Sequence, residues 1–322
     1  MKKVLCLGLS PVLQRTLRFD RLTPDEVNRA RQVMESAAGK ALNTARALVT
    51  LGTPAITAGF NGGASGARVT AMLKQYGVGD AMTTMPSPTR LCTTLLDDHA
   101  GTVTELVEEA PAPGRTALRR FIADNLSRIP GAALLAISGT LPPFAKDDFY
   151  VAFVRAARAA GVPVVIDSHR TALIQVLFEQ PLLAKLNVAE LEATLGEKLN
   201  TEARILRGMR DLLNLGAANV FVTQGSRAAY LLTPRAAWRF TPPAIRERVN
   251  PIGSGDCTTA GIVHALLRGK RLPDAVRLGL ACGSANAETL TPGTFDARRA
   301  RALCRTVTCE PRMVRETVPQ KN

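Results

Sequence analysis

Short apolar runs alternate with segments of helical length along most of this 322-residue chain, and this alternation limits the possible folds more than any other feature. The runs are apolar at successive positions, which is typical of strands buried on both faces of a parallel sheet. The sequence predicts such strands at 4–9, 55–60, 133–138, 162–167, 183–187 and 219–223. It predicts helices near 39–51, 65–76, 115–129, 146–160, 201–215, 255–268, 273–289 and 296–306. This order indicates an α/β fold with a doubly wound, mostly parallel sheet flanked by helices.

Two stretches, at about 12–35 and 89–109, interrupt the alternation because they carry strand patterns with no helix between them. In the second stretch, the turn His99-Ala100-Gly101 separates two such patterns and predicts a hairpin. We therefore expect a small separate β-sheet that covers one edge of the main sheet as a lid. The α/β domain would span residues 1–309, and the polar segment 310–322 would form a C-terminal tail.

The formal net charge of +14 favours anionic partners, among them phosphorylated metabolites, nucleotides, nucleic acids and membrane surfaces. Aromatic residues make up only 4% of the chain, which disfavours stacking on unpaired bases. The basic segment 298–305 could contact nucleic acid, but charge runs on helices are more often solvated faces, so no nucleic-acid partner is expected. The first apolar run is too short for a signal segment or a membrane span, and no later segment is long enough to span a membrane.

The cysteines are scattered, and their spacing bears on metal binding and on the compartment. None of the six cysteines forms a CxxC pair, and the three histidines do not cluster with them, so a structural zinc site is not expected. Unpaired, scattered cysteines fit a reducing compartment, and the sequence predicts a cytoplasmic protein.

The strongest chemical signal lies in the run Val249–Gly261. Gly253 and Gly255 permit a tight turn and leave backbone amides unobstructed, and Asp256 then opens an amphipathic helix. Such a turn points several unpaired N–H groups at one place, with the positive end of the helix dipole behind them, and binds an anion. Asp256 is either an ordinary helix cap or the base that accepts a proton from a hydroxyl while the amides hold a phosphoryl group.

Four other residues have both a structural and a functional interpretation. Lys40 precedes a helix beside Gly39 and Asn43, where it could bind an anion or lie solvated on the surface. Arg90, in the lid hairpin, could protect an edge strand or bind a substrate phosphate. Asn187 and Glu190 have the spacing of a capping box, and the same two side chains could also serve a metal ion.

The motifs occur in an order that resembles the PfkB family of carbohydrate kinases, within the ribokinase-like superfamily. Residues 249–256 match the family signature Val-Asn-Pro-[Val/Ile]-Gly-[Ser/Ala]-Gly-Asp. Further stretches similar to family motifs are 38–46, 59–63, 138–143, 185–190, 223–225, 284–286 and 291–294. The resemblance covers about residues 4–305 and is closest to the 1-phosphofructokinase and tagatose-6-phosphate kinase branch.

This resemblance implies ATP-dependent phosphorylation of a sugar-phosphate hydroxyl, such as one of fructose 1-phosphate or tagatose 6-phosphate, with Mg²⁺ as cofactor. Asp256 would act as the general base, and the anion hole would be formed by Gly253, Ser254 and Gly255. The nucleotide and its Mg²⁺ would be bound by Asn187, Glu190, Thr223, Gly225 and Asn286, with Asn187 and Glu190 reaching the metal through water. The sugar phosphate would be bound by Gln14, Gly39, Lys40, Asn43, Arg90 and Ser138. A homodimer formed through the lid is also implied.

The sequence departs from the family pattern on the acceptor side. Gln14 stands where the family usually has an Asp that binds acceptor hydroxyls, and it carries no charge. Ala38 and Ala41 replace the two glycines that the family usually has on either side of Gly39-Lys40, and their methyl groups leave a sugar less room to approach the backbone. These changes leave open a kinase of an unusual acceptor, a kinase of an unphosphorylated sugar, and a non-catalytic sensor of sugar phosphates or nucleotides.

Overall fold

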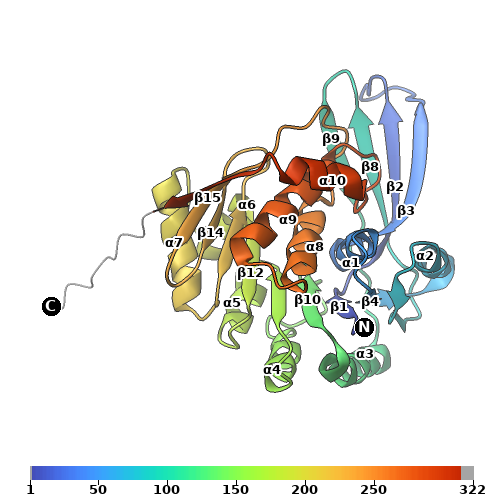
Figure 1. Ribbon diagram of the computed structural model, residues 1–322. Helices are drawn as coiled ribbons and strands as arrows, with labels where there is room; N and C mark the ends of the chain where they lie inside the picture. Colours follow the sequence, from blue (N-terminus) through green and yellow to red (C-terminus); the bar gives the residue numbers. More distant parts are fainter. Residues whose placement is uncertain (1, 313–322) are drawn as a thin grey trace.

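A ten-stranded sheet forms the centre of the molecule, and its order is β16-β15-β14-β13-β12-β11-β10-β1-β4-β6 (Figure 1). The structure, a computed structural model, describes residues 2–312. The strands are β1 (Val4–Leu7), β4 (Ala55–Ala58), β6 (Gly79–Asp80), β10 (Leu134–Ser138), β11 (Val164–Asp167), β12 (Leu183–Asn187), β13 (Val220–Thr223), β14 (Ala229–Leu232), β15 (Ala237–Thr241) and β16 (Thr308–Arg312). Pairing is parallel from β6 to β13 and antiparallel from β13 to β16.

Helices cover both faces of this sheet because successive strand residues point to opposite sides. In β1, Val4 and Cys6 pack in one hydrophobic cluster and Leu5 and Leu7 in the other. The first cluster includes residues of α1 (Lys40–Thr50), α2 (Gly63–Gln75), α8 (Ser254–Leu266), α9 (Leu272–Ala287) and α10 (Ala297–Cys304). The second includes residues of α3 (Arg115–Arg128), α4 (Val151–Ala159), α5 (Arg170–Leu177), α6 (Val188–Leu195) and α7 (Glu202–Asn214). The predicted doubly wound α/β fold is confirmed.

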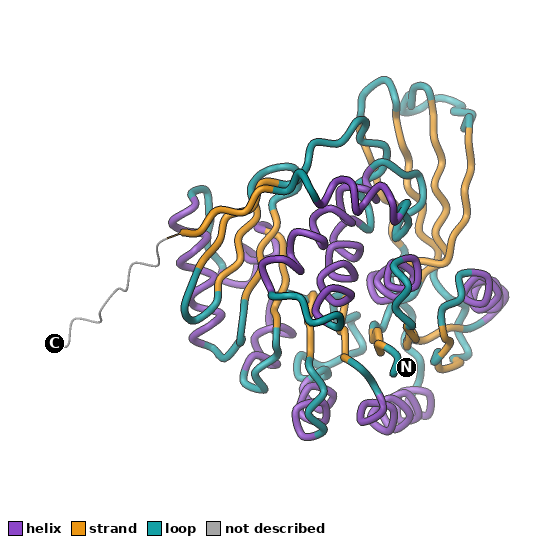
Figure 2. Tube along the Cα trace, viewed as in Figure 1, coloured by secondary structure: helices purple, strands orange, loops and turns teal. Residues whose placement is uncertain are grey.

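The expected small sheet is present and stands apart from the main sheet at one end of the molecule (Figure 2). Its order is β3-β2-β8-β9, from β2 (Val12–Phe19), β3 (Gln32–Ala38), β8 (Leu91–Asp97) and β9 (Thr102–Val107). Strands β2 and β8, 80 or so positions apart in sequence, pair in parallel with Gln14 opposite Cys92. We call this sheet the lid. A separate parallel pair consists of β5 (Phe60–Asn61) and β7 (Thr83–Thr84).

Several elements differ from the sequence expectation. The helix predicted from residue 146 begins at Val151, because Ala145, Phe149 and Val151 donate to carbonyls three residues back, as in isolated turns, and not four residues back. The strands β14, β15 and β16 were not among the predicted strands, and β16 takes residues 310–312 from the predicted tail by pairing with β15. The remaining tail residues, 313–322, lie outside the described part of the chain.

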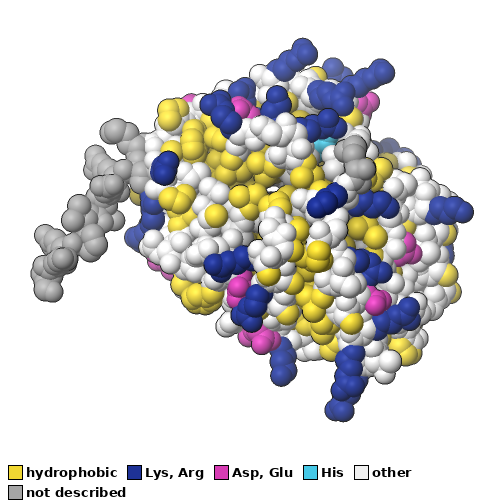
Figure 3. All heavy atoms as spheres, turned by 60° about the horizontal axis from the view of Figure 1, so that its bottom comes forward, with side chains coloured by type: hydrophobic (Ala, Val, Ile, Leu, Met, Phe, Trp, Pro, Cys, Tyr) yellow, Lys and Arg dark blue, Asp and Glu magenta, His cyan; other side chains and the backbone are white. Residues whose placement is uncertain are grey.

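No helix within residues 2–312 combines the length and apolar character needed to cross a bilayer. On the face in Figure 3, Lys and Arg side chains are dispersed among neutral and apolar ones and do not gather in one stripe.

Candidate active site

A cavity of about 800 Å³ lies at the carboxyl ends of the parallel strands, between the lid and the start of α8. In open parallel sheets, this edge is where ligands bind. The cavity is lined by nearly all the candidate residues from the sequence: Gln14, Gly39, Lys40, Asn43, Arg90, Asn187, Glu190, Thr223, Gly225, Gly253, Ser254, Gly255 and Asp256. Ser138 and Asn286 are the two candidates that do not line it. Residues separated by more than 200 positions therefore meet in one place.

The turn before α8 has the geometry of an anion site. Gly253 has a φ of 82°, and a Cβ there would lie 2.6 Å from the backbone nitrogen of Gly293, so only glycine fits. Within residues 2–312, the amides of Gly253, Gly255 and Asp256 have no hydrogen-bond acceptor, and no side chain caps the helix. These N–H groups and the positive end of the helix dipole are thus available to a negatively charged group in the cavity.

Asn286 supports this turn from behind. Its side chain is fully buried and donates to Ile252 O at 2.9 Å and to Ser254 Oγ at 3.1 Å. Its Oδ1 accepts from the amide of Gly293 at 2.8 Å. Because both ends of the amide are engaged within the turn, Asn286 fixes the turn and does not line the cavity.

Asp256 is 5% exposed and faces the cavity, where its Oδ2 accepts from Asn43 Nδ2 at 2.8 Å. Burial raises the pKa of Asp256 to about 7, and the nearby carboxylate of Asp167 adds to this rise against the opposing effect of Lys40. The hydrogen bond from Asn43 spans 213 positions and orients the carboxylate. A carboxylate with a pKa near neutrality is suited to accept a proton during a reaction.

A buried cluster of opposite charges lies beside Asp256. Lys185 Nζ lies 2.5 Å from Asp167 Oδ2, and Thr259 Oγ1 donates to the same oxygen at 3.2 Å. Lys40 Nζ lies 3.4 Å from Asp167 Oδ1 and 3.0 Å from Glu190 Oε1. Burial by itself would raise the pKa of Asp167, but the charges of Lys185 and Lys40 outweigh it and hold that pKa below its ordinary range.

Sequence reasoning did not select Asp167 or Lys185 as site residues. The available signal was a lysine in the middle of an otherwise apolar strand, 183–187, since a lysine is rarely fully buried without a partner. The partner could not be identified because Asp167 is brought to it only by the parallel pairing of β11 and β12.

Asn187 and Glu190 form the capping box that the sequence allowed. Asn187 Oδ1 accepts from the amide of Glu190, and Glu190 Oε2 accepts from the amide of Asn187, both at 2.8 Å. The other oxygen of Glu190 faces Lys40 at the cavity wall. Among the described residues, no group of three or more acidic, His or Cys side chains could hold a metal ion. A metal ion bound here would therefore draw most of its ligands from phosphates and water.

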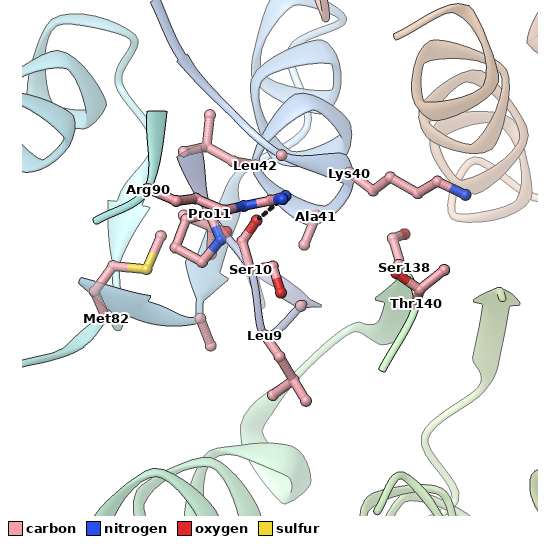
Figure 4. A pocket seen from close by; sticks show the side chains of 15 residues that line it. Leu9, Ser10, Pro11, Lys40, Ala41, Leu42, Met82, Arg90, Ser138 and Thr140 are labelled. Atoms are coloured by element: carbon pink, nitrogen blue, oxygen red, sulfur yellow. Dashed lines mark hydrogen bonds between the residues drawn. The ribbon is translucent and has the colours of Figure 1, made fainter. Parts of the chain in front are cut away.

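Among the residues expected to bind the acceptor, Gln14 donates from Nε2 to Thr94 Oγ1 at 2.7 Å, and its side chain is buried at the base of the lid. Arg90 donates to the carbonyls of Glu108 at 2.9 Å and Ser10 at 3.2 Å, the latter drawn in Figure 4. Gly39 has a φ of 111°, and a Cβ there would lie 3.1 Å from Ser10 O. The lid and the α1 start are thereby held close together over this part of the cavity.

Known proteins share the overall fold of this chain. A possible 1-phosphofructokinase of Thermotoga maritima superposes with a TM-score of 0.88 at 21% identity, covering 97% of this chain and 100% of that one. Escherichia coli phosphofructokinase-2 in complex with fructose-6-phosphate gives a TM-score of 0.85 at 25% identity, covering 95% and 99%. Arabidopsis thaliana ribokinase complexed with ribose and ATP gives 0.76 at 19% identity, covering 94% and 98%. The sequence pattern described as "pfkB family carbohydrate kinase" matches residues 1–296. This chain therefore belongs to the pfkB family of carbohydrate kinases and is an ATP-dependent sugar kinase.

Proposed function

We propose that this sugar kinase transfers the terminal phosphoryl group of ATP to a hydroxyl of a hexose phosphate, with Asp256 as the general base. The observation that carries the proposal is the juxtaposition of three unpaired amides, at Gly253, Gly255 and Asp256, with the Asp256 carboxylate at one cavity. The amides can stabilise negative charge on the transferring phosphoryl group, and the carboxylate can accept the proton of the attacking hydroxyl.

In this reaction, a bond forms between the acceptor oxygen and the terminal phosphorus while the bond from that phosphorus to the bridging oxygen of ADP breaks. The hydroxyl proton passes to Asp256, whose other oxygen stays hydrogen-bonded to Asn43. Thr223 and Gly225 line the part of the cavity where the nucleotide would lie. Mg²⁺, when bound with ATP, would neutralise phosphate charge, and Glu190 and Asn187 at the cavity wall would contact its water shell.

Arg90 supports a phosphorylated acceptor. Its guanidinium donates only to backbone carbonyls, and no carboxylate of residues 2–312 lies within 4.0 Å of it. A phosphate under the lid would provide the missing negative charge. Fructose 1-phosphate and tagatose 6-phosphate are the acceptors we propose to test first. The uncharged Gln14 instead favours a free sugar, or a sensor without turnover, so both remain alternatives in the test.

The test is ADP release with ATP, Mg²⁺ and one acceptor at a time. The acceptors are fructose 1-phosphate, fructose 6-phosphate, tagatose 6-phosphate, free fructose and free tagatose. We expect turnover with at least one phosphorylated ketohexose and a lower kcat/KM with its free sugar. Turnover restricted to free sugars would replace the proposed acceptor class. ATP binding with no turnover on any sugar would favour the sensor.

Replacing Glu190 by Gln separates the capping role from the metal role. Glutamine can also occupy the third position of a capping box, so we expect the free energy of unfolding to change by less than about 1 kcal/mol. The loss of the carboxylate charge should raise the Mg²⁺ concentration needed for half-maximal rate about 10-fold or more, in line with the usual cost of losing an outer-shell partner. The measurement is the rate against Mg²⁺ at saturating ATP. An unchanged Mg²⁺ dependence would leave Glu190 as a cap alone.

We also propose that a second copy of this chain covers the lid. The lid exposes the apolar side chains of Val33, Met34, Leu106 and Val107, and β9 is an edge strand with unpaired backbone groups. Sedimentation velocity should therefore give a dimer, and Leu106→Lys should shift it towards the monomer. A wild-type monomer at micromolar concentration would contradict the proposal.

All six cysteines are free in the structure. Four of them, Cys6, Cys92, Cys257 and Cys282, are buried without forming disulfides. This agrees with the reducing cytoplasmic location that we propose.

A further inference from the structure

A separate cavity of about 460 Å³ lies where α9 packs against the end of α8 and against α10. We call it the basic cavity, because four of its lining residues are cations: Lys270, Arg277, Arg301 and Arg305. None of its lining residues lines the cavity of about 800 Å³ described above, which we call the main cavity. Ala265 of α8 lines the basic cavity and Gly255 lines the main one, and ten residues of helix span about 15 Å. The two cavities are therefore distinct sites at opposite ends of α8.

The cations of the basic cavity lack negatively charged partners. Within residues 2–312, none of the four side chains donates a hydrogen bond or lies within 4.0 Å of a carboxylate oxygen, and Nε of Arg277 is buried without an acceptor. The one acidic residue on the wall, Asp274, instead accepts from Arg271 at 3.2 Å. By contrast, Arg299 of α10, outside this cavity, is paired with Glu288 at 2.7 Å. Positive charge is thus concentrated at the basic cavity and left without compensation, which attracts an anion.

The charge and the lining of the basic cavity indicate the class of anion. Four cations and one carboxylate give its wall a net charge of about +3. A phosphate monoester carries about 1.5 to 2 negative charges at neutral pH, so one phosphate group leaves the wall positive and two match it. Arg277 of α9 and Arg301 of α10 approach from different helices, and each guanidinium can hold two phosphate oxygens. Ala265, Leu278 and Cys304 add an apolar part, against which the carbon-containing body of a ligand can pack.

We infer that the basic cavity binds an organic anion with two phosphate groups, at a site separate from the catalytic one. Two sources share this chemistry, a nucleoside diphosphate and a sugar bisphosphate. The bound anion would contact the end of α8 and the start of α9, and the opposite ends of these helices carry the anion turn and Asn286, which fixes it. The inference goes beyond the proposed function and does not require it to hold.

The test counts the molecules bound per chain by equilibrium dialysis of the full chain, with ADP and fructose 1,6-bisphosphate as separate probes. We expect the wild type to bind one molecule more of at least one probe than the double variant Arg277→Gln, Arg301→Gln. The probe that shows this difference identifies the source of the anion. Each single substitution should weaken the affinity of the extra site about 10-fold or more, as expected for one lost hydrogen bond between charged groups.

The matched control is the double variant Arg268→Gln, Arg298→Gln, which removes the same charge from two exposed arginines that line neither cavity. It should bind as the wild type does. If the double variant of the cavity fails to fold, the exposed cavity residue Arg305 takes its place, and Arg305→Gln should weaken the extra site.

Equal numbers of both probes bound to the wild type and to the cavity variant would overturn the inference. An equal loss of binding in the cavity variant and in the control would also overturn it, because overall surface charge and not the cavity would then hold the anion. Neither result bears on the kinase proposal, which is decided by ADP release with the sugar panel.

Discussion

Replacing Asp256 by Asn should lower kcat by about 10²- to 10⁴-fold, the usual contribution of a general base, while the affinity for ATP changes little. Asparagine keeps the shape of the side chain and can still accept the hydrogen bond from Asn43, so the cavity should not collapse. It cannot take the proton of the attacking hydroxyl. The measurements are steady-state kinetics and ATP binding by calorimetry. Asp274→Asn, in the first turn of α9 and outside the main cavity, is the control. A kcat within a few-fold of wild type would leave Asp256 without a catalytic role.

Because the pKa of Asp256 is raised, both kcat/KM and the stability of the fold should depend on pH. The base must be ionised, so kcat/KM should rise with pH and level off above about 7. At a pH between 3.8, the ordinary pKa of an aspartate, and about 7, Asp256 keeps its proton in the folded protein but loses it in the unfolded chain. This group therefore favours folding at low pH, and the effect is lost as the pH rises to about 7. Asp256→Asn should therefore raise Tm more at pH 8 than at pH 5. A larger rise at pH 5 would contradict the raised pKa.

Replacing Lys185 by Met should lower the free energy of unfolding by about 3–5 kcal/mol, the typical cost of leaving one member of a buried ion pair without its partner. The side chains of Lys185 and Asp167 are 4% and 1% exposed, so water cannot replace the lost ammonium group. Lys40 remains 3.4 Å from the other carboxylate oxygen and compensates only in part. Denaturant unfolding measures the difference.

The control for Lys185→Met is Lys198→Met, because Lys198 forms an ion pair with Glu192 while its side chain is 85% exposed. That pair is screened by solvent, so its loss should have a far smaller effect. Adding Asp167→Asn to Lys185→Met should recover part of the lost stability by removing the unpaired charge. Equal effects of the two lysine substitutions would show that the buried pair does not stabilise the fold.

Much of the fold could be predicted from the sequence because its parallel core consists of short strands with strong local patterns. The six predicted strands all occur, with ends shifted by one or two residues in most cases. The antiparallel strands β14 to β16 were missed because each is only four or five residues long, and β15 and β16 are also half-exposed at the edge of the sheet, so their apolar periodicity is weak. The eight-residue helix α5 was missed for a similar reason, since eight residues give few repeats of a helical pattern.

The sequence by itself determined which backbone could bind an anion, because the glycines and the aspartate of residues 253–256 act within one turn and need no distant partner. Only the tertiary structure decided how that aspartate is tuned. The groups that raise or restrain its pKa, Asp167, Lys40 and Asn43, come from other strands and helices and meet it through the parallel pairing of the sheet and the packing of α1 against α8.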